Sequence, residues 1–281
     1  MLQRQLTINC KGRLISLEDP LVMGILNVTP DSFFDGGKYK TEKAVLRRVE
    51  EMMQEGAAII DVGGVSSRPG SEDVSELEEL GRVIPAIRLI AENFPEVILS
   101  VDTFRARVAE ASVEAGAAMI NDISAGRFDG KMYETLARLS VPYVLMHMQG
   151  QPKNMQQNPS YEDVVQEVLD FFIGKLGILR ELGIKDILLD VGFGFGKTLE
   201  HNYRLLKDLH IFKILEQPLL VGLSRKSMIC KLLNIKPVAA LNATTALNLV
   251  ALQQGAKILR VHDVREAVEV IETWKQLEAI E

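Results

Sequence analysis

The sequence predicts an α/β protein of the (β/α)8, or TIM, barrel class. Short runs that are apolar almost throughout alternate with segments of helical periodicity, as expected for parallel strands covered on both faces. Eight such repeats in about 250 residues fit a closed barrel better than an open doubly wound sheet, which usually has about five or six parallel strands. The runs are Leu21–Leu26, Ile59–Val62, Val97–Val101, Ala117–Ile120, Tyr143–Met146, Ile187–Leu189, Leu219–Leu223 and Ile258–Val261.

The segments between these runs place apolar residues on one face of a helix. From Val45 to Met53 they lie at i, i+4, i+7 and i+8, and Gly56 follows as a stop signal. Residues 165–176 and 264–271 carry similar stripes. We expect these faces to pack against the strands.

Residues 1–281 are predicted to form one barrel domain, with a hairpin in residues 1–20. No Pro/Gly/Ser-rich linker marks a boundary between domains. Leu6–Cys10 and Arg13–Ser16 flank a Lys11-Gly12 turn, a pattern typical of a β-hairpin. This hairpin could cover the amino-terminal mouth of the barrel.

Charge and cysteine content exclude several classes of protein. Lysine and arginine number 32 against 38 acidic residues, and the net charge of −6 disfavours nucleic acid and anionic membranes as partners. Cys10 and Cys230 lie far apart with no CxxC motif, so neither a disulfide framework nor a thiolate zinc site is indicated. Without a signal-peptide pattern or a long apolar run, we expect a soluble cytoplasmic protein.

Polar residues follow every predicted strand, at the barrel face where chemistry is found in this fold. Helix capping or loop bracing is an equal alternative for four of them, Thr103, Asp122, Ser227 and Asp263. Asp102 and Asp190 directly follow apolar runs, so their carboxylates should point into the barrel mouth, where burial without a partner costs several kcal/mol. A ligand with paired N–H donors would supply that partner.

A second group of polar residues is cationic and also follows predicted strands. It comprises Arg68, Lys226, Arg260 and His262. In an acidic protein this group indicates an anionic ligand, and the loops after strands 7 and 8 often bind phosphate in this fold. The alternative is a salt-bridge network with Asp61, Asp122 and Asp263.

Two loops and one glycine-rich segment need separate interpretation. The loops at 28–40 and 63–74 are long for connections between a strand and a helix, so we expect them to close over a ligand. Gly192–Thr198 resembles a P-loop, but the motif requires glycine where Val191 stands. No transition-metal motif is present, whereas an Asn27 oxygen and ligand phosphates could hold Mg²⁺.

Seven short motifs occur in order, each at the end of a predicted strand. They are Gly24–Phe33 (GILNVTPDSF), Ser66–Gly70 (SSRPG), Ser100–Thr103 (SVDT), Asn121-Asp122, Gly192–Lys197 (GFGFGK), Gly222–Ser227 (GLSRKS) and Arg260–Val264 (RVHDV). Together these motifs resemble those of the dihydropteroate synthases, pterin-binding (β/α)8 enzymes of folate biosynthesis, over essentially the whole chain.

The resemblance implies a reaction, its substrates and a cofactor. Enzymes of this family condense 6-hydroxymethyl-7,8-dihydropterin pyrophosphate with p-aminobenzoate, giving 7,8-dihydropteroate and pyrophosphate, with Mg²⁺. Pyrophosphate leaves before the amine attacks, so a pterin-methyl cation forms. The family also implies a homodimer and a target of sulfonamides.

Roles for individual residues follow from the same resemblance. Asp102, Lys226 and Arg68 are the expected catalytic residues. The pterin would be bound by Asp102, Asn121, Asp190, Lys226, Met146 and Phe195. Its pyrophosphate would be bound by Asn27 with Mg²⁺, Arg68, Arg260 and His262. p-Aminobenzoate would be bound by Ser67, Pro69, Phe195 and Ser227, while Asp31 and Asp35 would order the closed loop.

The chain departs from the family pattern at several positions. The family commonly has glutamate at Val65, threonine at Ser67 and proline at Val191. Ser67 keeps a hydroxyl group, whereas the loss of a carboxylate at Val65 should alter how the second loop is braced. The stretch Leu241–Asn248 also differs, and we expect it to lie away from the chemistry, at a dimer interface.

Two other functions remain as alternatives. A pterin-dependent methyltransferase that passes a folate methyl group to a corrinoid protein would share the pterin-binding carboxylates, but would have little need for Ser66–Gly70. A non-catalytic pterin-binding paralogue is compatible with Val65. Release of pyrophosphate that depends on p-aminobenzoate separates the synthase from both.

Overall fold

Parallel strands close into a barrel, as the sequence predicts. The computed structural model describes residues 6–28, 38–65 and 73–280. Hydrogen-bonded neighbours run β10-β3-β4-β5-β6-β7-β8-β9 around the closed sheet. The strands are β3 (Leu21–Asn27), β4 (Ile59–Gly63), β5 (Ile98–Asp102), β6 (Met119–Asp122), β7 (Tyr143–Met146), β8 (Ile187–Asp190), β9 (Leu219–Val221) and β10 (Ala256–Val261).

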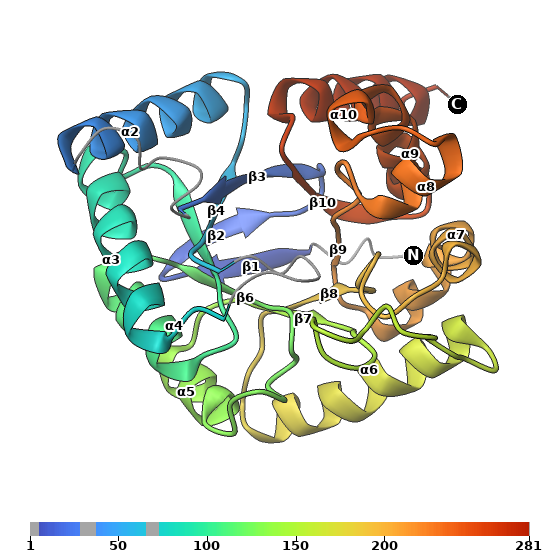
Figure 1. Cartoon of the computed structure of the whole chain (residues 1–281), viewed down its shortest axis with the longest axis horizontal. Coiled ribbons are helices and arrows are strands. Elements are labelled where there is room, and N and C mark those ends of the chain that lie inside the picture. Colours follow the sequence, from blue (N-terminus) through green and yellow to red (C-terminus); the bar gives the residue numbers. More distant parts are fainter. Residues whose placement is uncertain (1–5, 29–37, 66–72, 281) are drawn as a thin grey trace.

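Helices form a ring outside the strands (Figure 1). Their apolar faces and the outward-facing residues of the barrel form one continuous core, which includes Val49 of α2 and Val22 of β3. The helices are α2 (Lys38–Gln54), α3 (Glu76–Asn93), α4 (Ala106–Ala115), α5 (Met132–Leu139), α6 (Val164–Glu181), α7 (Leu199–Lys207), α8 (Ser227–Leu233), α9 (Leu241–Gln253) and α10 (Val264–Glu278), with the 3-10 helices η1 (Leu209–Leu215) and η2 (Pro237–Ala239).

The strand predictions are confirmed in number and order, with shifts at their ends. The run predicted at Ala117–Ile120 becomes β6 two residues later, because the polar pair Asn121-Asp122 continues the ladder beside β7. β3 and β5 likewise end on polar residues, Asn27 and Asp102. Hydropathy marks the buried part of a strand, whereas backbone pairing extends into the polar mouth.

The predicted hairpin is present and fills the amino-terminal end of the barrel. β1 (Thr7–Cys10) pairs antiparallel with β2 (Arg13–Ser16). Ile8, Cys10 and Leu17 are buried against one inward-facing residue from each barrel strand. This inner layer consists of Met23, Ile59, Ile98, Met119, Val144, Leu188, Leu220 and Ile258. The amino-terminal mouth is therefore packed with side chains and closed to ligands.

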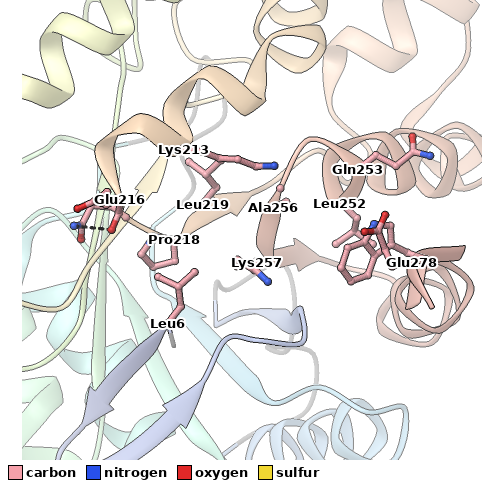
Figure 2. A pocket seen from close by; sticks show the side chains of 13 residues that line it. Leu6, Lys213, Glu216, Pro218, Leu219, Leu252, Gln253, Ala256, Lys257 and Glu278 are labelled. Carbon is pink, nitrogen blue, oxygen red and sulfur yellow. Dashed lines mark hydrogen bonds between the residues drawn. The ribbon is translucent and has the colours of Figure 1, made fainter. Parts of the chain in front are cut away.

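A cavity of about 420 Å³ lies at the amino-terminal end of the barrel beside this hairpin (Figure 2). The start of β9 and β10 and helix α10 line it, with Leu6 of the hairpin at its edge. Its charged residues are of both signs, Lys213 and Lys257 against Glu216 and Glu278. This is the face of the fold that serves stability, so the chemistry is sought at the opposite face.

Leu17→Ala tests the packing role of the hairpin. We expect the free energy of unfolding to fall by about 2–5 kcal/mol, because the truncation leaves a cavity in a closed layer. Leu14→Ala in the same hairpin is the control, since this side chain is 71% exposed, and its effect should be below about 0.5 kcal/mol. Equal urea midpoints for the two variants would contradict this role.

Candidate active site at the carboxyl ends of the strands

The alternation of side chains along each strand places a polar layer directly above the apolar plug. Residues two positions beyond the plug residues point into the barrel again. In this layer Asp61, Asn121, Asp190 and Arg260 replace the hydrocarbon side chains below. Asp102 follows one step further along β5. A step of two residues along these strands therefore leads from the packed core to a polar chamber.

Arg260 joins two carboxylates across the interior of the barrel. Its Nε donates to Asp61 Oδ2 and its Nη2 donates to Asp102 Oδ2, each at 2.7 Å. Asn121 Nδ2 donates to the same Asp61 oxygen at 2.9 Å. Asp61 is fully buried, and the side chains of Arg260 and Asp102 are each 20% exposed. β4, β5, β6 and β10 thereby supply one connected network.

This network leaves unused capacity to bind a ligand. Asp61 Oδ1 is buried and accepts no hydrogen bond. Burial, opposed by Arg260 and reinforced by Asp61, raises the pKa of Asp102 to about 7. For Arg260, burial opposes the charge, but the two carboxylates outweigh it and raise the pKa. A ligand with several N–H groups would relieve the cost of the unpartnered oxygen.

The salt-bridge alternative of the sequence analysis accounts for part of the cationic group. Arg260 forms the predicted salt bridge with Asp61, and it also pairs with Asp102. Asp263 pairs instead with Arg225, outside the barrel mouth.

Asp122 does not pair with Arg260. Its carboxylate accepts from the backbone of Ser124 and Gly126 and from the Tyr143 hydroxyl. Asp122 thus braces a loop, the alternative that the sequence left open for it.

Asp190 and Lys226 form the opposite side of the chamber. Asp190 Oδ1 accepts from the Gly192 amide at 2.8 Å, and burial raises its pKa. Lys226 Nζ donates to the Phe193 carbonyl and lies 4.8 Å from the centre of the Phe195 ring. Burial lowers the pKa of Lys226 to about 8, although the Asp190 charge opposes this. The lysine is thus close to losing its charge in a mildly basic solution.

An apolar wall adjoins these charged groups. Met146 at the end of β7 is buried with Ile123, Met148 and Met155, and Phe195 packs against this cluster. A flat heterocycle would find sulfur and aromatic surface here beside carboxylates and a lysine.

Other predicted residues lie at the outer edge of the mouth. Asn27 is exposed at the end of β3, and Ser227 is exposed at the first position of α8. Ser224 Oγ lies 3.0 Å from His262 Nδ1 and accepts from the His262 amide. Arg48 Nη2 donates to the His262 carbonyl.

Several predicted residues lie outside the described residues, namely Asp31, Asp35, Ser67, Arg68 and Pro69. The two flanks of the second loop are described. Arg82 donates to the Gly64 carbonyl at one end, and Arg105 donates to the Val74 carbonyl at the other. Buried Glu79 pairs with Arg105.

Sequence reasoning missed two residues of this site. The sequence predicts only a salt bridge for Asp61, yet this residue is the centre of the network. The alternation of side chains along β4 could have identified Asp61, because Ile59 faces the barrel interior and Asp61, two residues later, faces the same way. Lys197 belonged to the rejected P-loop segment, and it is 2% exposed beneath the turn that carries Phe195.

Carboxylates, an amide and two cations gathered at the strand ends of a (β/α)8 barrel define a barrel enzyme for a flat, nitrogen-rich substrate. Residues 23–262 match the family model described as "Pterin binding enzyme". The chain belongs to this family of pterin-binding enzymes, and its similar relatives place it among the dihydropteroate synthases.

Those relatives cover nearly the whole chain. Dihydropteroate synthase of Escherichia coli strain K12 is 49% identical over 263 residues, 93% of each chain. The Yersinia pestis enzyme in complex with a sulfonamide drug has a TM-score of 0.91 and 45% identity, covering 98% of this chain and 100% of that one. The Xanthomonas albilineans enzyme with 4-aminobenzoic acid has a TM-score of 0.92 and 41% identity, covering 99% and 100%.

Arg260→Met tests the network that spans the barrel. Removing the guanidinium leaves buried carboxylates without their cation, so the free energy of unfolding at pH 8 should fall by about 3–5 kcal/mol. The loss should be smaller at pH 5, because Asp102, whose pKa burial already raises, is then protonated instead. Urea unfolding at both pH values measures this.

Arg107→Met is the matched control, because Arg107 pairs with Glu76 on the surface. Its effect should stay below about 1 kcal/mol at either pH. A loss for Arg260→Met that is equally small would show that the carboxylates do not depend on this cation.

Proposed function

We propose that this protein is a dihydropteroate synthase, which joins 6-hydroxymethyl-7,8-dihydropterin pyrophosphate to p-aminobenzoate and releases pyrophosphate. The observation that carries the proposal is the buried network of Asp61, Asp102, Asn121 and Arg260, which retains an unpartnered carboxylate oxygen. A pterin presents ring N–H and amino groups along one edge, and these are the donors that such a chamber lacks.

The pterin would lie between the polar network and the apolar wall. Asp102 and Asp190 would accept its ring N–H and amino protons. Asn121 already donates to Asp61, so its Oδ1 would meet a pterin donor. Lys226 would donate to the ring carbonyl or a ring nitrogen, and Met146 and Phe195 would pack on the ring faces.

The pyrophosphate would lie at the outer edge of the mouth. Asn27 and His262 lie at the ends of β3 and β10, which are hydrogen-bonded neighbours. Arg260 gives Nε and Nη2 to carboxylates, so Nη1 would be the nitrogen that meets a phosphate oxygen. Arg68 would add a further positive charge.

Magnesium would be bound jointly by protein and substrate. Among the described residues, no cluster of three or more acidic, histidine or cysteine side chains could hold a metal ion by itself. Asn27 is an exposed residue, and its amide oxygen suits Mg²⁺ when the remaining ligands are phosphate oxygens and water. The ion would supply charge neutralisation on the departing pyrophosphate.

The chemistry requires opposite charges at the two ends of the pterin. Breaking the bond from carbon to oxygen places negative charge on pyrophosphate, next to Arg260 and His262, and positive charge on the pterin-methyl group. The carboxylates of Asp102 and Asp190 would stabilise that cation until the amine of p-aminobenzoate attacks. Phe195, Ser227, Ser67 and Pro69 would position the amine.

We also propose a cytoplasmic homodimer. Leu232 and Leu233 of α8 and Val238 of η2 are at least 50% exposed and adjoin α9, which contains the divergent stretch at 241–248. A second copy would cover these apolar side chains. In the described part of the chain, no helix is long and apolar enough to span a membrane. Sedimentation equilibrium of the parent chain and of Val238→Asp tests the dimer.

Turnover tests the function directly. Purified protein with the pterin pyrophosphate, p-aminobenzoate and Mg²⁺ should release pyrophosphate, and a sulfonamide should compete with p-aminobenzoate. Asp102→Ala and Lys226→Ala should each weaken pterin binding by about 100-fold, through loss of charged hydrogen bonds, whereas Arg68→Ala should mainly lower kcat. Glu110→Gln is the control, because Glu110 lies on the surface of α4 beside Arg138.

Normal turnover by Asp102→Ala would refute the proposed pterin pose. Methyl transfer to a corrinoid protein without pyrophosphate release would favour the methyltransferase. Pterin binding without turnover would favour a non-catalytic paralogue.

The pH dependence of kcat/KM for the pterin substrate should be bell-shaped. Asp102 and Asp190 must both be ionised to accept protons, and burial raises the pKa of each, that of Asp102 to about 7, so activity should fall as the pH drops through these values. Lys226 must be charged, and its pKa is lowered to about 8, so activity should fall above it. Rates at constant ionic strength from pH 5 to pH 10 measure this, and a flat profile would contradict it.

A further inference from the structure

The turn after β8 receives hydrogen bonds at every backbone carbonyl from Gly192 to Gly196. Lys197 Nζ donates to Gly192 O and to Phe195 O, each at 3.1 Å. The other three carbonyls accept from different segments. Those donors are Lys226 to Phe193 O, Gln156 to Gly194 O and Tyr161 to Gly196 O. A loop of this kind is usually mobile, and here its conformation is determined by surrounding side chains.

The turn is also packed tightly on the loop after β7. Gly192 and Gly196 adopt left-handed backbone conformations, with φ of +69° and +61°. A Cβ at Gly192 would overlap the His147 carbonyl oxygen, and one at Gly196 would overlap the Gln149 carbonyl oxygen. Glycine is therefore required at both positions, and Lys197 lies buried where the two loops meet.

The ammonium group of Lys197 has a complete set of acceptors. Besides the two turn carbonyls, its Nζ lies 3.0 Å from His147 Nδ1. The His147 carbonyl oxygen lies a further 3.4 Å from Nζ, so three N–H groups are surrounded by four acceptors, and none of these acceptors is a carboxylate. Burial, with the charges of Lys197 and Arg127, lowers the pKa of His147 to about 2, so its ring is neutral and can accept.

Three residues assigned to the pterin depend on this turn. Asp190 Oδ1 accepts a hydrogen bond from the Gly192 amide, so a shift of Gly192 would move this donor away from the carboxylate. Lys226 is held by the Phe193 carbonyl and lies over the Phe195 ring. Lys197 contacts the Gly192 and Phe195 carbonyls. Burial, opposed by the Asp190 charge, lowers the pKa of Lys197 to about 7, so at and below neutral pH its positive charge favours ionised Asp190.

We propose that Lys197 is a positioning residue for the pterin site, which anchors the Gly192–Gly196 turn to His147 and supplies a buried positive charge beside Asp190. This inference rests on the proposed function. Lys197 acts through the turn and through Asp190, and it needs no contact with substrate.

Charged or titratable groups from four other elements lie around Asp190 of β8 and the turn that follows it. Arg127 follows β6 and donates to Met148 O, and His147 follows β7. Lys226 directly precedes α8 as its N-cap residue, and Arg260 comes from β10. Burial raises the pKa of Asp190, while Lys226, Arg260 and Lys197 lower it. Removing the charge of Lys197 should therefore raise the pKa of Asp190 and move the acid limb of the pH profile to higher pH.

Lys197→Met tests the proposal, since methionine fills the space without donors or charge. We expect KM for the pterin substrate to rise about tenfold and kcat to fall less than about threefold. The acid limb of kcat/KM should move up by about half a pH unit. Calorimetry should measure the affinity for the pterin pyrophosphate, and thermal unfolding should measure the stability of the variant, alongside the kinetics.

Tyr161→Phe is the matched control. It removes one hydrogen bond to the same turn, keeps the ring between His147 and His201, and changes no charge. Its KM should change by less than about threefold, with an unmoved acid limb. This variant separates simple loosening of the turn from the effect of the lysine charge.

Lys197→Gln covers the case in which Lys197→Met does not fold. The amide keeps donors for the carbonyls but has no charge, so KM should recover in part while the acid limb stays shifted. Parent values for both quantities in a folded Lys197→Gln would overturn the proposal. Failure of both variants to fold would assign Lys197 to folding alone and would also overturn it. A parent chain without turnover would instead refute the proposed function.

Discussion

The structure depends on one buried guanidinium that neutralises carboxylates from two other strands. Arg260 lies on β10, while Asp61 and Asp102 lie on β4 and β5, separated from β10 by β3 in the closed sheet. Such burial is expensive, and removing one partner costs more than the assembled set. The barrel can therefore hold Asp61 and Asp102 in its interior only while the arginine remains, which keeps these acceptors in place before a ligand arrives.

Two ends of one barrel serve different purposes because the layers inside it differ. At the amino-terminal end, the hairpin residues Ile8 and Leu17 complete an apolar plug. One layer higher, Asp61 and Asn121 replace hydrocarbon on the same strands. The plug provides a rigid base through hydrophobic burial, and this rigidity lets the polar layer above keep groups with unsatisfied hydrogen-bonding capacity.

The polar layer combines groups whose protonation equilibria lie close together. Burial raises the pKa of Asp102 to about 7 and lowers that of Lys226 to about 8, so both charged forms coexist in a narrow range of pH. A pterin that donates to the acid and accepts from the lysine would widen that range. Lys197 near Asp190 is a further buried group of this kind. Burial lowers its pKa, and carbonyl and imidazole acceptors surround its ammonium group.

The sequence by itself determined the barrel class, the hairpin and the polar character of each strand end, because hydrophobic periodicity and local turn chemistry are read within short segments. Only the tertiary structure decided which polar groups pair. Arg260 reaches Asp61 and Asp102 because the sheet closes, and Lys197 is buried because two loops meet over it. Arg260 is separated in the chain from Asp61 by 199 positions and from Asp102 by 158. No local sequence pattern predicts pairs that are so far apart.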